Sequence, residues 1–187
     1  MMLVFMLEEL SMKVFLEGLL PRILPEGVSF TLIPHQGKSD LEKSLPRKLR
    51  GWKAPDSYFV VVRDQDSGDC YKIKSRLRQI CVEAGRPEVL IRIACRELEA
   101  WFIGDLAAVG RAFCAGGLAD QQKKRKYRTP DTLGSPSREL ETLVKGYGKV
   151  KGARKLGPLI DMENKRSTSF AAFISGVQGL AAHVVSS

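Results

Sequence analysis

Cysteine and histidine are scarce in this chain, which has four cysteines and two histidines in 187 residues. No two cysteines form a Cys-x-x-Cys pair, and at least ten residues separate each from the next among Cys70, Cys81, Cys95 and Cys114. This distribution argues against a structural zinc site and against a disulfide framework. It fits a protein of the reducing cytoplasm.

Long apolar runs are also missing. The apolar residues at the start of the chain reach Glu8 and Glu9 without a preceding basic segment. A helix that spans a bilayer needs about 20 apolar residues, and a signal peptide needs a basic leader. We therefore expect neither a signal peptide nor a membrane anchor.

Acidic residues are outnumbered by basic ones. The chain has 21 Asp and Glu residues against 30 Lys and Arg residues, which gives a formal net charge of +9. An excess of this size favours a polyanionic partner such as nucleic acid. The excess is concentrated in residues 121–155, which contain eleven Lys or Arg residues and three Asp or Glu residues.

Apolar runs and helical periodicities alternate along the first part of the chain. Strands are predicted at residues 3–7, 28–33, 58–62 and 89–94, and helices at about residues 11–20, 39–50, 73–84 and 97–113. Such alternation predicts an α/β fold with right-handed crossovers. We expect a Rossmann-like core in residues 1–115, with a parallel sheet of about four strands flanked by helices.

Residues 116–187 are predicted to form a basic, mainly helical extension that packs on the core. Its glycine-rich run at residues 145–155 mixes cations with an aromatic ring, and its glycines would let the backbone approach a phosphate closely. We expect nucleic-acid contacts from Lys145, Tyr147, Lys149, Lys151, Arg154 and Lys155. The basic run at residues 123–126 is interpreted instead as a solvated loop.

Three acids follow the third predicted strand. Residues 58–62 are apolar enough to be buried on both faces, and Asp64, Asp66 and Asp69 come directly after them. Carboxylates this close raise one another's pKa unless a cation neutralises them, and oxygen ligands favour Mg²⁺ or Mn²⁺. The alternative is an acidic turn that caps the next helix, which is the role expected for Asp69.

Acids also follow two other predicted strands. Glu8 comes after the first strand, and Glu97 and Glu99 come after the fourth. Because the carboxyl ends of parallel strands share one edge of a sheet, these acids are expected near Asp64 and Asp66, which favours a metal site over a turn. Two residues along a helix subtend roughly 200°, so one glutamate of the pair is expected to face the site, and Glu97 is nearer to the strand.

The chain resembles the TOPRIM (topoisomerase–primase) domain, and more closely an uncharacterised TOPRIM-like family of prokaryotic proteins. The resemblance covers about residues 3–115 and rests on four segments in order. These are Glu8-Glu-Leu-Ser11, His35-Gln-Gly-Lys-Ser-Asp-Leu41, Arg63-Asp-Gln-Asp-Ser-Gly-Asp69 and Arg92-Ile-Ala-Cys-Arg-Glu-Leu-Glu-Ala-Trp-Phe102. Weaker similarity extends to residues 147–149 and 169–170.

This resemblance implies Mg²⁺-dependent hydrolysis of DNA or RNA phosphodiesters. Relatives include nucleases of the overcoming-lysogenisation-defect type, and TOPRIM-like proteins are often encoded beside ATPases in phage-defence systems. The implied metal ligands are Glu8, Asp64 and Asp66, with Glu97 in support. A cation near the leaving oxygen is expected from Lys38, Lys149 or Lys151, and Lys38 is favoured because the loop after the second predicted strand lies at the same edge of the sheet. His35 in that loop is a candidate base or a structural residue.

Two other functions fit parts of the pattern. Many of the related nucleases have glycine after the first glutamate and an acid four residues after it, where this chain has Glu9 and Met12. This departure favours a non-catalytic, metal-binding or nucleic-acid-binding subunit of an ATPase complex. Asp64-Gln-Asp66 also imitates the motif of haloacid-dehalogenase phosphatases, although there the motif follows the first strand. Self-association as a homo-oligomer is a further expectation.

Overall fold

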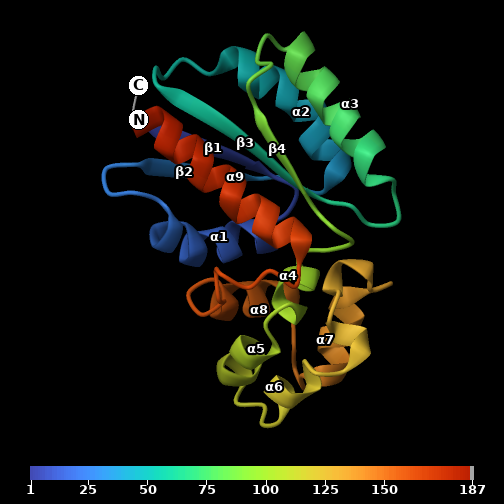
Figure 1. Cartoon of the computed structure of the whole chain (residues 1–187). Helices are drawn as coiled ribbons and strands as arrows, with labels where there is room; N and C mark the ends of the chain where they lie inside the picture. The colour runs from blue at the N-terminus through green and yellow to red at the C-terminus, as the bar shows by residue number, and fades with distance from the viewer. Residues whose placement is uncertain (186–187) are drawn as a thin grey trace.

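A four-stranded parallel sheet forms the centre of the fold in a computed structural model that describes residues 1–185 (Figure 1). The strand order is β2-β1-β3-β4. The strands are β1 (Met2–Leu7), β2 (Ser29–Pro34), β3 (Ser57–Asp64) and β4 (Leu90–Ala94). The predicted α/β class, with its four parallel strands, is confirmed.

Helices cover both faces of this sheet. On one face lie α1 (Leu10–Ile23) and the long C-terminal α9 (Thr168–Val185); on the other lie α2 (Lys38–Gly51) and α3 (Cys70–Glu83) (Figure 1). Side chains of β3 alternate between the two cores, because successive residues of a strand point to opposite faces. Val60 and Val62 pack on the α1 side, and Phe59 and Val61 pack on the α2 side.

The order of the strands creates a switch point at the carboxyl ends of β1 and β3. The chain passes from β1 to β2 on one side, and then crosses to place β3 on the other side of β1. Connections diverge at such a point, and open α/β sheets bind their ligands there. The residues that follow β1 and end β3 therefore occupy the position where a ligand is expected.

The helix predicted over residues 97–113 is divided in two. The structure has α4 (Glu99–Ile103) and α5 (Leu106–Phe113), separated by Gly104 and Asp105. Asp105 ends the first helix and caps the second, because its Oδ1 accepts a hydrogen bond from the backbone N of Ala108 at 3.0 Å. The sequence predicted a single helix because its apolar periodicity continues across the residue that caps α5.

Most of residues 116–185 is helical, as the sequence predicts. After α5 come α6 (Leu118–Gln121), two 3₁₀ turns (Arg125–Tyr127 and Pro130–Thr132), α7 (Pro136–Leu143) and α8 (Lys149–Leu156). The chain then returns over the sheet as α9, whose Phe173 ring lies 5.1 Å from that of the buried Trp101. Trp101 is thus part of the core. None of the helices within residues 1–185 has the length and apolarity needed to cross a membrane.

The helices α1 and α8 touch backbone to backbone. A Cβ atom added at Gly157 would lie 2.4 Å from the carbonyl oxygen of Phe15, and one at Gly18 would meet the ring of Pro158 at 2.7 Å. Arg22 in α1 fixes the same contact, since its guanidinium donates to the carbonyl oxygens of Gly157 at 3.0 Å and Ile160 at 2.9 Å. Gly18 and Gly157 therefore allow the close packing of α1 and α8.

Candidate functional site

The predicted acids meet at the switch point of the sheet. Asp64 is the last residue of β3, and Glu8 follows β1 directly. The Oε2 of Glu8 accepts a hydrogen bond from the backbone N of Asp64 at 3.1 Å. Asp64 is 4% exposed, and its Oδ1 has no hydrogen-bond partner among the described residues.

Two arginines compensate the charge of the acids on the α2 side. Because it precedes Asp64 in the strand, Arg63 points to the opposite face, where its Nη1 bonds Oε1 of Glu42 at 2.6 Å and its Nε lies 3.7 Å from Oε2 of Glu8. Glu42 also pairs with Arg76 at 2.6 Å. Arg63 is buried, so this chain of charges fixes the carboxylate of Glu8 on one side of the sheet edge.

Asp66 is paired with the lysine that was predicted beside it. Its Oδ2 lies 3.0 Å from Nζ of Lys38, the first residue of α2. The backbone of Asp66 is left-handed, with φ of 55°, and its N donates to the carbonyl oxygen of Arg96 at 2.7 Å. Lys38 and Asp66 are both partly exposed, so this pair forms the outer part of the site.

Glu99, rather than Glu97, faces Asp64. The Oε2 of Glu97 accepts a hydrogen bond from the backbone N of Ser137 at 2.7 Å, at the start of α7. Glu99 is 0% exposed; its Oε1 accepts from the hydroxyl of Tyr147 at 3.2 Å, and its Oε2 has no hydrogen-bond partner in the described part of the chain. The choice of Glu97 is corrected because Arg96, with φ of 63°, turns the chain before α4 begins.

The α8 side of the site carries more negative charge than its cations neutralise. Burial, followed by the charges of Glu8, Glu99 and Glu9, raises the pKa of Asp64 well above its usual value. Burial likewise raises the pKa of Glu99 to about 6, and it raises the pKa of Glu8. These directions mean that the folded protein holds carboxylates whose ionised form is poorly stabilised.

Lys149 provides the nearest cation on this side. Its Nζ lies 3.8 Å from Oε1 of Glu9 and 4.0 Å from Oε2 of Glu99. Burial lowers the pKa of Lys149, but the charges of Glu99, Glu9, Asp64 and Glu97 together outweigh burial and leave this pKa raised. One ammonium at these distances makes ion pairs without short hydrogen bonds, so it compensates the acids incompletely.

The donor chemistry of the cluster suits a hard divalent cation. Mg²⁺ and Mn²⁺ prefer carboxylate oxygens, and Asp64 Oδ1 and Glu99 Oε2 are buried oxygens that lack a hydrogen-bond partner within residues 1–185. No three His, Cys, Asp or Glu side chains in that range are placed so that together they could hold a metal ion. A bound cation would therefore require these carboxylates to turn toward a common point.

Four of the six residues predicted to contact nucleic acid are exposed, namely Lys145, Lys151, Arg154 and Lys155, whereas Tyr147 and Lys149 are partly buried. Lys149 is turned to the acids, and Tyr147 packs its ring 5.9 Å from that of Phe113. The Nζ of Lys155 donates to the carbonyl oxygen of Ala112 at 2.7 Å, and that of Lys151 to the carbonyl oxygen of Gly146 at 3.2 Å. Lys145 and Arg154 are exposed. The predicted glycine-rich loop is largely the helix α8, where Gly152 faces the ring of Tyr147.

Two other predicted residues have structural positions. Asp69 caps α3, because its Oδ1 accepts from the backbone N of Lys72 at 3.0 Å, which confirms that prediction. His35 is buried; its Nδ1 lies 2.8 Å from the carbonyl oxygen of Leu7 and its Nε2 lies 2.7 Å from Nζ of Lys48. Burial lowers the pKa of His35. Its ring thus joins β1 to α2, which favours the structural interpretation.

Residues 7–178 match a protein family described as a domain of unknown function (DUF4276). The chain belongs to this family. The match begins at the last residue of β1 and ends within α9, so it covers β2, β3 and β4, the acidic cluster and the helices α1 to α8. Comparisons with curated proteins and with solved structures gave no match.

Proposed function

We propose that this protein is a Mg²⁺-dependent nuclease that hydrolyses phosphodiester bonds of DNA or RNA at the carboxyl ends of β1 and β3. The observation that carries the proposal is Asp64, a buried carboxylate at the switch point with an oxygen that lacks a hydrogen-bond partner among residues 1–185. Folding a charge into such a position costs stability, and binding a cation recovers that cost. The resemblance to TOPRIM proteins points to the same chemistry.

Three carboxylates would hold the cation. Asp64 interacts with both of the others, since its backbone N donates to Glu8 and the charge of Glu99 raises its pKa. A bound Mg²⁺ or Mn²⁺ supplies a water of lowered pKa and charge stabilisation on the phosphoryl oxygens. Arg63 contacts Glu8 and the hydroxyl of Tyr147 bonds to Glu99, and both contacts would shift as the carboxylates turn toward the cation.

The substrate would approach from the side of Lys38. Its ammonium is about half exposed and bonded to Asp66 at the same edge of the sheet. A lysine held in this way places a positive charge where the phosphate of a nucleic acid would arrive. The exposed Lys145 and Arg154, in the basic segment that contains α8, extend the positive charge beyond the site. The net charge of +9 favours association with a polyanion in general.

One observation favours a non-catalytic alternative, in which the protein is a binding subunit of an ATPase complex. Lys149 already partly neutralises Glu9 and Glu99, and an internal ammonium can replace a metal as the counterion of an acidic cluster. In that case the protein binds nucleic acid, with or without Mg²⁺, and cuts only as part of a larger assembly or not at all.

Cleavage assays with matched variants test the proposal. Purified protein is incubated with plasmid DNA or with RNA, with Mg²⁺, Mn²⁺ or EDTA. We expect metal-dependent cleavage that Asp64→Asn and Glu99→Gln abolish and that Glu97→Gln retains, since Glu97 bonds to the backbone of α7. Cleavage that survives Asp64→Asn would rule out this site. Binding without cleavage would support the binding subunit, and hydrolysis of small phosphomonoesters would support a phosphatase.

A further inference from the structure

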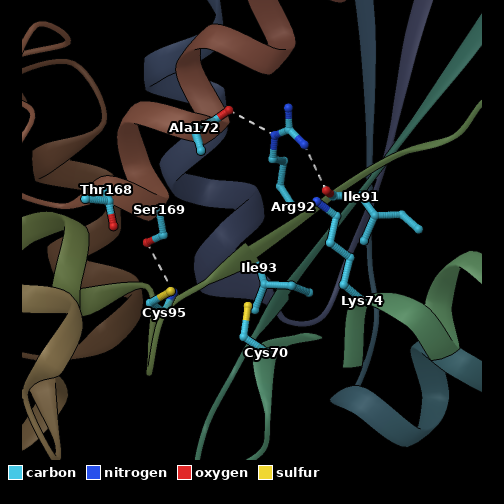
Figure 2. Close-up of a pocket in the computed structure, with 9 residues that line it drawn as sticks. All are labelled: Cys70, Lys74, Ile91, Arg92, Ile93, Cys95, Thr168, Ser169 and Ala172. Carbon is cyan, nitrogen blue, oxygen red and sulfur yellow. Dashed lines mark hydrogen bonds between the residues drawn. The ribbon is translucent and has the colours of Figure 1, made fainter. Parts of the chain in front are cut away.

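Two cysteines line a cavity at the outer edge of β4. The cavity has a volume of about 220 Å³ and lies between α3, β4 and the start of α9 (Figure 2). Cys70 is the first residue of α3, and Cys95 follows the last residue of β4. Figure 2 shows the sulfur of Cys70 beside Ile93 and Cys95 below Ser169, and each cysteine side chain is partly exposed. A small oxidant can therefore reach both thiols.

The two cysteines belong to loops that already run together. The backbone N of Gln65 donates to the carbonyl oxygen of Ala94 at 2.9 Å, and that of Asp66 donates to Arg96 at 2.7 Å. The Oε1 of Gln65 accepts from the backbone N of Arg96 at 3.1 Å. These bonds hold the exit loop of β3, which leads to Cys70, against the exit loop of β4, which begins with Cys95.

We propose that Cys70 and Cys95 form a reversible disulfide in the presence of a hydroperoxide, and that this bond ties the exit loops of β3 and β4 together. The pairing follows from the shared cavity and from the hydrogen bonds that already fix the two loops. The other two cysteines are placed differently, because Cys81 is buried in the core on the α2 side and Cys114 is exposed at the end of α5.

The reaction has two steps. The thiolate sulfur of Cys70 attacks the peroxide, the O–O bond breaks, and Cys70 becomes a sulfenic acid with release of hydroxide, which takes up a proton to give water. The sulfur of Cys95 then attacks the sulfenic sulfur, the S–O bond breaks, and the proton of the Cys95 thiol leaves with the oxygen as a second water. Burial, Asp131 and Cys70 raise the pKa of Cys95 to about 11, so Cys95 stays a thiol until Cys70 is oxidised.

Oxidation would also restrain the residues on both sides of the bond. Asp66 lies four positions before Cys70, and Glu99 lies four positions after Cys95. A covalent link between the loops limits how far these acids can separate. Hydrogen exchange of residues 65–69 and 95–98 should therefore slow on oxidation. Unchanged exchange in a protein that carries the disulfide would overturn this part of the proposal.

Mass spectrometry tests the bond directly, without any assay of nuclease activity. The full chain with Cys114→Ser is treated with hydrogen peroxide, and the remaining thiols are alkylated after unfolding. We expect a loss of about two mass units, two fewer alkylated thiols, and a linked pair of peptides that contain Cys70 and Cys95. Dithiothreitol should reverse all three changes, and Cys81→Ser should not alter them.

Substitution of either partner distinguishes this bond from random oxidation. Cys70→Ser and Cys95→Ser should each prevent the loss of two mass units. Wild-type protein equilibrated in glutathione buffers tests the bond without any substitution. The linked peptides should appear as the buffer becomes more oxidising. Oxidation of Cys70 to a sulfinic acid without a linked peptide, or a disulfide that includes Cys81, would overturn the proposal.

Discussion

The acids at the end of the sheet have different surroundings on its two sides. On the α2 side, Glu8 and Glu42 share the buried Arg63, and Asp66 bonds to Lys38. On the α8 side, Asp64 and Glu99 are more deeply buried and have Lys149 as their nearest cation. Carboxylates that are paired with cations therefore stabilise the structure, whereas carboxylates without a close cation would be stabilised by a bound ligand. The predictions below test this difference.

The largest effect on stability is expected at Arg63. Arg63→Met leaves the partly buried Glu42 and the buried Glu8 with less positive charge, and loss of one partner of a buried pair costs about 3 kcal/mol. Urea denaturation at pH 7 measures this cost. Arg76→Met is the control, because the side chain of Arg76 is 68% exposed and solvent screens its pairing with Glu42, so the loss of stability should be much smaller. Equal losses at both positions would contradict the assignment of Arg63 to the structure.

Asp64→Asn should have opposite effects on stability and on activity. Without metal at pH 7, the amide removes a poorly stabilised buried charge and should raise the free energy of unfolding by about 1–2 kcal/mol. Metal-dependent cleavage should fall about 100-fold or more. Asp69→Asn is the control, since asparagine also caps helices and should change neither quantity. A destabilised Asp64→Asn protein would show that Asp64 is already compensated.

The pKa of Glu99 predicts how stability depends on pH. The pKa of Glu99 is raised from 4.5 to about 6 in the folded protein. The stability contributed by its protonated form is therefore fully present below pH 4.5 and is lost as the pH rises through 6. Between pH 4.5 and pH 7 in EDTA, the free energy of unfolding of Glu99→Gln should therefore rise by about 2 kcal/mol relative to that of the wild type. Thermal denaturation across this range measures the gain, which saturating Mg²⁺ should reduce. A constant difference would contradict the raised pKa.

The smallest effect on stability is expected at Lys38. Its ion pair with Asp66 is about half exposed, so Lys38→Ala should change the free energy of unfolding by less than about 1 kcal/mol. Affinity for a nucleic-acid oligonucleotide should nevertheless fall, and the salt dependence of binding should become weaker, because one phosphate contact is lost. Fluorescence anisotropy at several salt concentrations measures both changes. Unchanged binding would remove Lys38 from the path of the substrate.

The sheet and its order of elements could be predicted from the sequence because strands buried on both faces have a simple signal. Residues 3–7 and 58–62 are continuous apolar runs, and the acids that follow them fix which end of the sheet carries charge. The convergence of Glu8 and Asp64 follows from parallel pairing alone, since Leu7 lies beside Val62 in the register of β1 and β3.

The position of Glu99 could not be predicted in the same way. It depends on the left-handed backbone of Arg96 and on the break at Gly104 and Asp105, which orient a five-residue helix. Neither Arg96 nor Asp105 has a sequence signal that separates it from an ordinary helical residue. The position of Tyr147 was missed because a tyrosine among lysines also suits a nucleic-acid surface, and its partner Glu99 is 48 residues away in the chain.

The contact between α1 and α8 links the charge at the site to the spacing of two helices. Lys149 and the glycine contact at Gly157 lie at opposite ends of α8, about 12 Å apart along its axis. Arg22 and the bare backbone at Gly18 set how near α8 can come to α1, and hence how near the ammonium of Lys149 comes to Glu9. A partner or modification that separates these helices would withdraw that ammonium and leave Glu9 and Glu99 with more uncompensated negative charge.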